Sequence, residues 1–351
     1  MSQPSESDQQ QAVRSAQERT LGQYHQFMQI NAASHLIRAL RQLGLIDALR
    51  EQQHTLQQLC TPGSLNAELV REILDAAVAI GIVEQYEDDY ALSRAAHLLC
   101  QYDHDLADQR WERLVSLARG ESKRDAHDDR LHANHLAATQ WIHTPAAMEA
   151  AEVLDFGGSS AEQSIHVLDL GCGSAVWSCA MAYRDPKVIV TAVDHAESLQ
   201  AATSTAESIG LGDRFRTVAA DPFQADLEAS KFHWVVIALQ LSTMGRAASE
   251  PLLKKAVDCA RVGGQVVIID LVEMGGKPTL NDRMDSLRIK LETRQGAIPT
   301  PETLQQQLSA VGLQECQFAL LSKGRSKIGV AVAKRVAGRT RDAPHAACLL
   351  I

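Results

Sequence analysis

The chain has 351 residues, of which 45% are hydrophobic and 22% are charged, with a formal net charge of −9 and a pI near 5.8. This composition is typical of a globular protein long enough for two domains of ordinary size. The acidic balance argues against a phosphate-binding surface, where Lys and Arg would gather, so we expect no nucleic-acid partner.

The cysteines and the chain ends bear on compartment. Seven cysteines are spread along the chain without a C-x-x-C pair, which favours neither a disulfide framework nor a zinc site and fits a reducing cytoplasm. No apolar run of about 18 residues and no secretory leader are present, so we expect no membrane association. The last residues, Cys348 to Ile351, formally match a prenylation box, but a frayed tail is the simpler interpretation, and modification of Cys348 is left open.

The N-terminal part predicts a tail followed by a small helical module. Residues 1–20 are rich in Gln, Ser and Glu, and we expect them to be disordered. Ile30, Ile37 and Leu40 belong to an apolar stripe at helical spacing that ends at Gly44. Two more helices (55–59, 67–80) and a β-hairpin (81–86 and 90–92), with Ser93 capping the next helix, complete a winged-helix module over residues 21–102.

A winged-helix module raises a DNA-binding hypothesis, which the local charges oppose. Between Thr61 and Cys100 there are two basic residues, Arg71 and Arg94, against seven acidic ones. Phosphates would repel a recognition helix with this balance. A regulatory DNA-binding protein therefore stays only as a minor alternative.

Residues 103–160 read as a helical connector that contains a group of histidines. His132 and His135 lie three residues apart on one helix face, where Asp128 or Asp129 could complete a metal site. The stretch is polar on all sides, however, so a solvated face explains it better. We therefore expect no metal.

The segment from His166 to Ser174, HVLDLGCGS, reads as a buried strand, a glycine turn and the start of a helix. Gly171 and Gly173 permit positive φ and close approach to a ligand, and Ser174 is expected to cap the helix. The third glycine of the dinucleotide fingerprint is replaced by Val176. With Asp194 ending the next strand, this pattern favours a nucleoside held by its ribose hydroxyls over a dinucleotide.

At this point the chain resembles the class I S-adenosylmethionine-dependent methyltransferases, whose first motif has the form V-L-D-x-G-x-G, and Asp221-Pro222-Phe223 follows in the expected order. The N-terminal phrases LGLIDAL (43–49) and ALSRAAHLL (91–99) resemble the dimerisation domain of small-molecule O-methyltransferases. The resemblance covers residues 25–335 and implies a homodimer. It implies a Rossmann-like α/β domain over 161–335, followed by a flexible tail over 336–351.

The strand pattern of this domain fits a mostly parallel sheet with an antiparallel edge hairpin. Five strands alternate with helices and two further strands close the edge: 166–170, 188–194, 215–220, 233–238 and 265–271, then 318–321 and 328–333.

The resemblance also assigns roles around S-adenosylmethionine. Asp169 and the backbone of Gly171 and Gly173 would hold its methionine part. Asp194 would bind the ribose hydroxyls through charge-assisted hydrogen bonds. The adenine ring would lie between His195 and Pro222, with Asp221 at its amino group. Phe223 reads as a core residue.

The acceptor is expected to be a small aromatic or polyketide-like molecule. In the family the connector forms one wall of its pocket, and the phrase WIHTPAAM (141–148) lies where residues cover the transferred methyl group. The candidate contacts are His135, His143, Met148, Gln240 and Met244.

Such enzymes usually place a catalytic histidine just after the fourth strand, but here the phrase ALQLSTM (238–244) has none, and Ser242 or Leu241 takes its place. The supporting glutamate is also absent, because residues 295–300 read QGAIPT. A positioned base contributes about 10² to 10⁴ in rate. Three explanations follow: an acceptor that needs no base, a base supplied by His135 or His143, or cofactor binding without methyl transfer.

The leading hypothesis is a homodimeric methyltransferase of the cytoplasm, with Ser242, His135 and His143 as catalytic candidates. The alternative within the family is a cofactor-binding member with non-methylating chemistry. The sequence leaves the acceptor and the methylated atom open.

Overall fold

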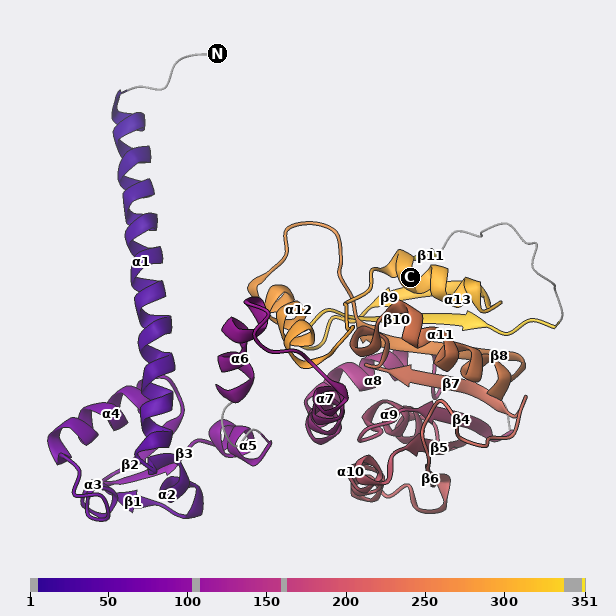
Figure 1. Cartoon of the computed structure of the whole chain (residues 1–351), viewed down its shortest axis with the longest axis horizontal. Helices are drawn as coiled ribbons and strands as arrows, with labels where there is room; N and C mark the ends of the chain where they lie inside the picture. Colours follow the sequence, from indigo (N-terminus) through magenta and orange to yellow (C-terminus); the bar gives the residue numbers. More distant parts are fainter. Residues whose placement is uncertain (1–5, 103–107, 159–162, 338–348, 351) are drawn as a thin grey trace. The chain divides into compact units, whose positions relative to one another are not determined.

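The computed structural model describes residues 6–102, 108–158, 163–337 and 349–350. The chain divides into two compact units, Met1–Ala107 and Asp108–Ile351 (Figure 1). Helices of the expected connector therefore belong to the second unit. Within the described residues, no helix has the length and apolar character needed to cross a bilayer.

The first unit begins with a long helix, α1 (Glu6–Gln42). We expected a disordered tail over residues 1–20, and the helix corrects this from Glu6 onward. The reason is that Gln, Glu, Ala and Arg, which dominate this stretch, are good helix formers even where they build no apolar face. The polar composition of residues 6–20 indicates that they pack against no hydrophobic core. A segment without a core contact can still form a helix.

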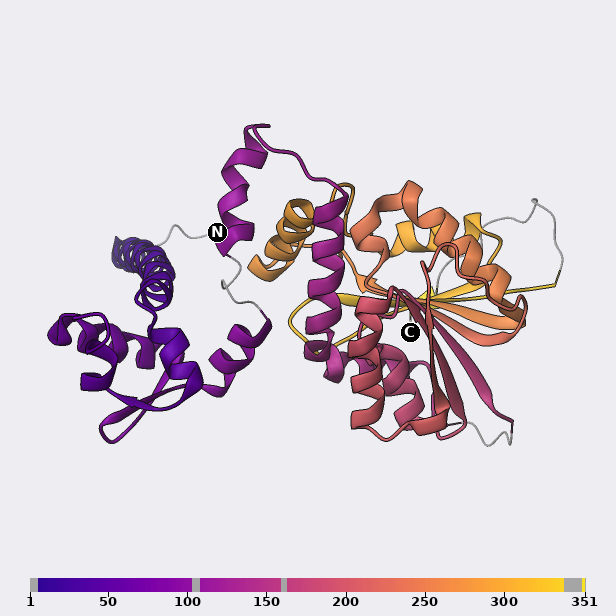
Figure 2. The same cartoon turned by 60° about the horizontal axis from the view of Figure 1, so that its bottom comes forward.

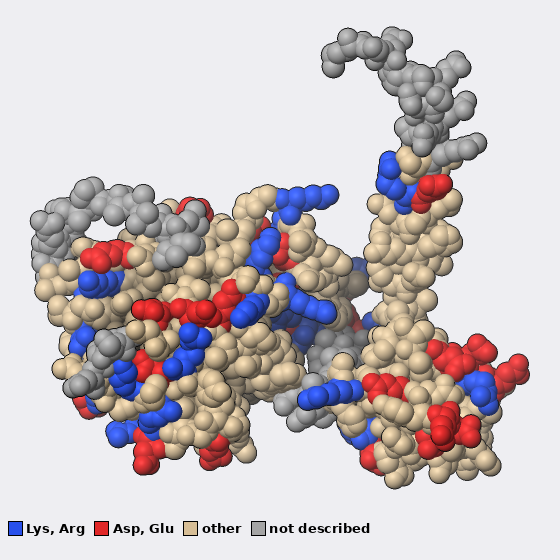
Figure 3. All heavy atoms as spheres, turned by 180° about the vertical axis from the view of Figure 1, so that it is seen from behind, with Lys and Arg blue, Asp and Glu red and all other residues tan. Residues whose placement is uncertain are grey.

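Most of the apolar side chains of α1 are exposed. Leu21, Tyr24, Phe27, Met28 and Ile30 are each more than half exposed, whereas Leu40, near the end of the helix, is fully buried. Residues 20–37 carry no Lys, Arg, Asp or Glu. Figure 3 shows this part of the helix as an uncharged column. The helix thus joins the core of its unit only at its C-terminal end.

The rest of the first unit has the expected order of helices and hairpin. The core contains Leu45, Leu49, Leu74 and Tyr90, and Ser93 Oγ accepts a hydrogen bond from the Ala96 amide, as a helix cap does. A short strand joins the hairpin, giving the sheet order β1-β3-β2. The elements are α2 (Leu45–Glu51), β1 (His54–Thr55), α3 (Leu56–Cys60), α4 (Ala67–Ala79), β2 (Val83–Tyr86), β3 (Asp89–Leu92) and α5 (Arg94–Tyr102).

The second unit is built on an eight-stranded sheet with the order β11-β9-β10-β8-β7-β4-β5-β6. The pairs from β6 through β5, β4 and β7 to β8 are parallel, and β10 runs antiparallel to β8 and β9. This confirms the mostly parallel sheet and its antiparallel hairpin. The strands are β4 (Ile165–Leu170), β5 (Val188–Asp194), β6 (Phe215–Ala219), β7 (Phe232–Ala238), β8 (Ala260–Leu271), β9 (Gln314–Leu320), β10 (Ile328–Lys334) and β11 (Leu349–Leu350).

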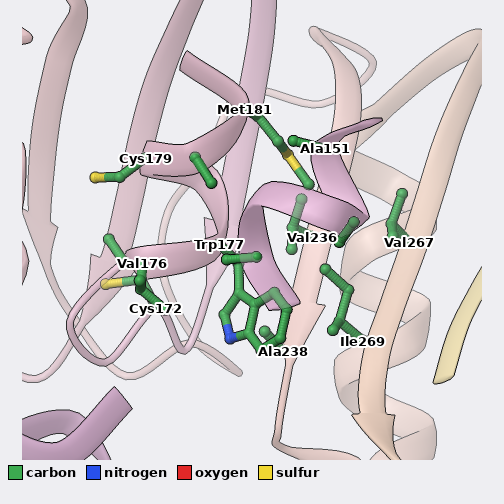
Figure 4. Close-up of a cluster of buried hydrophobic side chains, with 14 of the residues drawn as sticks. Ala151, Cys172, Val176, Trp177, Cys179, Met181, Val236, Ala238, Val267 and Ile269 are labelled. Carbon is green, nitrogen blue, oxygen red and sulfur yellow. The ribbon is translucent and has the colours of Figure 1, made fainter. Parts of the chain in front are cut away.

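Helices cover both faces of this sheet (Figure 2). On one face, side chains such as Val167 pack with Trp177, which Figure 4 shows among Ala151, Ala238 and Ile269. The opposite face has its own core. The first face packs against α8 (Thr144–Val153), α9 (Val176–Arg184) and α10 (Ala196–Ser208), and the second against α11 (Leu241–Cys259) and α13 (Pro301–Ala310).

Three further helices and two short 3₁₀ turns complete the unit. Asp125 and Thr279 begin two of these helices with capping boxes, in which the side chain at the start and the third helical residue exchange hydrogen bonds. The elements are α6 (Asp108–Ala118), α7 (Ala126–Thr139), η1 (Gln140–His143), η2 (Gly212–Arg214) and α12 (Leu280–Glu292).

The expected C-terminal tail needs one correction. Leu349 and Leu350 form β11, which pairs in parallel with Gln317 and Phe318 of β9. Two apolar residues complete backbone pairing on an edge strand that has open hydrogen-bonding groups. Cys348 lies outside the described residues.

Gly329 tests the packing of the edge hairpin. A Cβ at this β10 position would lie 2.6 Å from Cε2 of Phe318 and 2.8 Å from Cγ1 of Val272. Overpacking of this kind costs about 1–3 kcal/mol, so Gly329→Ala should lower the free energy of unfolding by that amount in urea titration. Gly275→Ala is the control, because a Cβ there meets no atom within 4 Å. Equal stabilities of the two variants would contradict the packing.

Candidate functional site

The sequence-predicted polar residues meet at the carboxyl ends of the parallel strands. Asp169 lies near the end of β4, Asp194 ends β5, and Asp221 follows β6. In open parallel sheets this edge, beside the first strand, is where ligands bind. The topology alone therefore brings together three carboxylates that are far apart in sequence.

The turn after β4 has the backbone that its glycines predict. Gly171 and Gly173 have φ of 71° and 54°. The amides of Gly171 and Cys172 both donate to Val193 O, at 2.9 and 3.2 Å, which fixes the turn against β5. The helix cap is not Ser174, as we expected, but Ala175, which itself has a φ of 55°.

Asp194 joins the glycine turn to the second strand. Its Oδ2 accepts a hydrogen bond from the Gly173 amide at 2.8 Å and its Oδ1 accepts one from the His195 amide at 2.7 Å. The residue is 8% exposed. Burial raises the pKa of this carboxyl, although both amide bonds oppose the shift. The carboxylate is thus oriented by two backbone amides, and the side chain of Ser198 also hydrogen-bonds to it.

Asp169 is fully buried beneath the turn. Its Oδ2 accepts a 2.5 Å hydrogen bond from Ser178 Oγ, and its Oδ1 has no partner within the described residues. Burial raises the pKa of Asp169 to about 7. Asp169 thus joins the end of β4 to α9 through Ser178, and its second oxygen is a buried acceptor without a partner within the described residues.

Two glutamines lie against the glycine turn, and sequence reasoning gave neither of them this place. Gln140 Oε1 accepts hydrogen bonds from the amide and the hydroxyl of Ser174, at 3.1 and 3.2 Å. Gln240 Nε2 donates to Gly171 O at 3.1 Å. A Cβ on either glycine would come within about 3 Å of these carboxamides, and the positive φ at both positions favours glycine whatever the space. We expected Gln240 in the acceptor pocket, and the structure places its amide on the turn.

The expected adenine contacts follow β5 and β6. His195 is exposed at the start of α10, Pro222 is buried, and Asp221 Oδ1 accepts from the Phe223 amide at 2.9 Å. Phe223 is 40% exposed, so it is not the core residue we expected. A ring 40% open to solvent leaves an apolar surface beside Asp221.

The expected acceptor contacts separate onto the two faces of the sheet. Met148 packs against the Trp177 core and Met244 against the core of the opposite face. The imidazole of His143 stacks on Trp177 with ring centroids 6.0 Å apart. Burial, aided by the charge of Arg288, lowers the pKa of His143 to about 4. A group so weakly basic is a poor proton acceptor at neutral pH.

Ser242 does not present itself as a base. It is 1% exposed, its amide donates to Asp270 Oδ2 at 3.0 Å, and its carbonyl accepts from the Ala297 amide at 2.8 Å. Burial raises the pKa of Asp270 to about 6, and hydrogen bonds from Ser242 oppose the shift. The serine thus fastens the start of α11 to the end of β8.

The connector histidines are not all on a solvated face. His132 is 5% exposed and its Nδ1 bonds to Glu292 of α12. His135, which we also considered as a base, is half-buried. The spacing of these residues showed that they share a helix face. It could not show that α12, about 160 residues later, supplies a carboxylate to it.

A nucleoside that carries an amino acid group fits these features. They are the glycine turn, the carboxylates of Asp194 and Asp221, and the unpartnered oxygen of Asp169. A cavity of about 490 Å³ lies elsewhere, at the amino ends of the strands near His233 and Arg261. Within the described residues, no group of three or more His, Cys, Asp or Glu side chains could hold a metal ion. The candidate site rests on side-chain chemistry and not on cavity size.

Comparisons with known proteins agree with this placement. Residues 167–264 match the family model described as a methyltransferase domain. No curated protein matches the chain.

Many solved structures share the fold. The mitomycin 7-O-methyltransferase MmcR is 17% identical, covers 92% of this chain and 99% of its own, and has a TM-score of 0.69. Human N-acetylserotonin methyltransferase, solved with S-adenosylmethionine, is 16% identical over 91% and 98%, with a TM-score of 0.65. The dimethyltransferase RosA of Streptomyces davawensis, which acts on 8-amino-8-demethyl-D-riboflavin, is 17% identical over 91% and 99%, also at 0.65. Residues 167–264 therefore match a methyltransferase domain, and the chain has the class I S-adenosylmethionine-dependent methyltransferase fold, with an N-terminal helical unit, that is found in O-methyltransferases.

Proposed function

We propose that the protein transfers a methyl group from S-adenosylmethionine to a small molecule. The observation that carries the proposal is the oriented carboxylate of Asp194 beside the glycine turn. This oriented carboxylate suits the ribose hydroxyls, because hydrogen bonds from hydroxyls to an ionised acceptor are stronger than those between neutral groups. Asp169 and the turn would hold the methionine part, and His195, Asp221 and Pro222 the adenine.

The protein's contribution is mainly geometric. The bound cofactor supplies a methyl group on a positively charged sulfur, and the displacement removes that charge. Positioning two molecules in line and excluding water are therefore the main requirements. The buried indole of Trp177 and the neutral imidazole of His143 supply a dry wall on the connector side.

The acceptor is proposed to be aromatic or polyketide-like. The related enzymes are named for mitomycin, N-acetylserotonin and a riboflavin derivative, all of which contain rings. RosA is named as an N,N-dimethyltransferase, so the shared fold is compatible with nitrogen acceptors as well as oxygen. His143 and Met148, which pack with Trp177, and Met244, which packs against the opposite core, stay proposed acceptor contacts.

Cofactor binding without methyl transfer is the second candidate, and a specific observation favours it. Ser242 is buried against Asp270, and the pKa of His143 is about 4, so neither replaces the missing histidine of the family. Methyl transfer monitored with radiolabelled cofactor separates the two functions.

The cytoplasm is the proposed location, and the acidic winged-helix module makes DNA binding the weakest alternative.

Asp194→Ala tests the cofactor site. Loss of charge-assisted hydrogen bonds, which contribute about 1.5–3 kcal/mol, should weaken S-adenosylhomocysteine binding roughly 10-fold to 150-fold in calorimetry. Wild-type affinity should also fall as acid protonates Asp194. That fall should start above the ordinary range of an aspartate, because burial raises this pKa. The variant should lack this pH dependence.

Asp213→Ala is the matched control, since Asp213 lies on the exposed turn η2. The wild-type protein should gain about 2.7 kcal/mol of stability with the ligand at 100 times its dissociation constant. Absence of any thermal shift would remove the cofactor assignment. Equal affinities of Asp194→Ala and wild type would remove Asp194 from the ribose site.

We also propose a homodimer that pairs through α1. The uncharged stretch 20–37 exposes Leu21, Tyr24, Phe27 and Met28, and a contiguous apolar surface on a helix marks an interaction site. A second copy is the partner that the related dimerisation domains imply, and a two-fold interface would pair the same patch on both chains.

Light scattering tests the dimer. The wild type should have twice the 38.2 kDa chain mass at micromolar concentration. Phe27→Glu should shift the equilibrium to the monomer, because it places a charge in an apolar contact. Gln17→Glu, outside the uncharged stretch, is the control. A monomeric wild type would refute the proposal.

A further inference from the structure

We propose that His132, oriented by Glu292, is the general base that accepts the proton of a hydroxyl acceptor. This inference rests on the proposed methyl transfer and supplies the base that the sequence lacks after the fourth strand. It differs from the positions considered from sequence, which were Ser242, His135 and His143.

The two side chains form a dyad from elements far apart in the chain. Nδ1 of His132, on α7, bonds to Oε2 of Glu292, the last residue of α12. Both residues are more than nine-tenths buried. A carboxylate at Nδ1 fixes the tautomer that carries its proton there, so the lone pair is on Nε2. A base whose second nitrogen is oriented by a third group is the arrangement that activates hydroxyl nucleophiles.

The other imidazole nitrogen is available. Nε2 of His132 is buried and has no hydrogen-bond partner within the described residues. An unsatisfied buried polar atom destabilises the folded state, so its retention needs an explanation. A role in holding α12 against α7 does not explain the unpaired nitrogen. The ion pair of Arg294 with Asp129, at 2.5 Å, already joins the residues after α12 to α7.

The position of His132 on its helix relates it to the cofactor turn. Asp128, His132, Leu136 and Gln140 recur every four residues, and all four are buried. Positions four apart lie on one helix face. Gln140, at the end of this stripe, contacts Ser174 of the glycine turn. His132 is therefore on the buried side of α7, and it lies two helical turns, or about 12 Å along the helix axis, from the residue that contacts the glycine turn.

Charges around the dyad keep its carboxylate ionised. Arg110 pairs with Glu292 Oε1, and Arg288 lies 4.0 Å from Oε2. Burial acts to raise the pKa of Glu292, but the hydrogen bond and charge of His132 and the two arginines outweigh it, and the net shift is downward. The ionised carboxylate then stabilises the imidazolium that forms when Nε2 takes a proton.

The step balances as follows. The acceptor O–H bond breaks and its proton moves to Nε2, while an oxygen lone pair forms the bond to the methyl carbon. The bond between that carbon and the cofactor sulfur breaks, and its electron pair stays on sulfur. His132 leaves the step as an imidazolium beside Glu292 and returns its proton to solvent.

The first experiment needs neither cofactor nor acceptor. Nitrogen-15 NMR of histidine-labelled wild type, with His132→Asn to assign the signal, should show a neutral His132 ring at pH 8 with its proton on Nδ1. Glu292→Gln should change this tautomer population. A proton on Nε2, or a charged ring at pH 8, would overturn the proposal.

The second experiment measures methyl transfer to catechol, 1-naphthol and 1-hydroxyanthraquinone. His132→Asn should lower turnover on the order of 10²-fold or more and leave S-adenosylhomocysteine affinity within about twofold, since a base acts mainly in the transition state. His127→Asn, exposed on the same helix, is the control and should keep full turnover. Retained cofactor affinity shows that the variant is folded.

The pH profile separates a base from a structural residue. Wild-type kcat/KM should rise with pH as the ring loses its proton. The rising limb should move to lower pH in Glu292→Gln, because the carboxylate charge no longer favours the imidazolium. Full turnover in His132→Asn would overturn the inference while the proposed function stands. Cofactor binding without transfer to any of the three acceptors would count against both, and a failure to bind cofactor would remove the proposed function itself.

Discussion

The hydrogen bonds of the glycine turn are the constraint on which the site depends. All five backbone amides from Gly171 to Ala175 are satisfied, by Val193 O, by Asp194, by Gln140 and within the turn itself. A positive φ at both glycines and at Ala175 makes this path possible. These partners belong to β5 and to η1. The turn therefore keeps its conformation only when both the sheet and η1 are packed against it.

The site also separates carboxylates by environment. Asp169 is fully enclosed and its pKa is raised to about 7, whereas Glu292 is buried among arginines and its pKa is lowered. Asp169 therefore takes up a proton more readily than an ordinary aspartate, whereas Glu292 stays ionised. Burial raises the pKa of both groups, so the hydrogen bond and charge of His132 and the nearby arginines account for the opposite net shift of Glu292. A charged carboxylate beside His132 and a carboxyl with a raised pKa near the end of β4 can therefore occur in the same domain.

The sequence predicts those parts of the site whose residues depend on near neighbours in the chain, and it fails where the partner is distant in sequence. The motif at Gly171 and the aspartates at the ends of β4 and β5 could be predicted because each follows its own strand, and parallel strands bring their carboxyl ends to one edge. Ser174 was misassigned as a cap, since its amide and hydroxyl bind Gln140 instead. Local sequence shows that Ser174 can cap a helix. Whether it does so depends on Gln140, which is 34 residues earlier in the chain and binds its amide and hydroxyl instead.

The sequence by itself determined the alternation of strands and helices, the glycine turn and the family resemblance, because these depend on periodicity and on neighbours in the chain. The tertiary structure alone decided that His132 is buried against Glu292 and that Ser242 is fastened to Asp270. It also decided that the apolar face of α1 stays exposed within one chain. The physical reason is that burial, pairing and pKa depend on which distant elements pack together, and no local pattern carries that information.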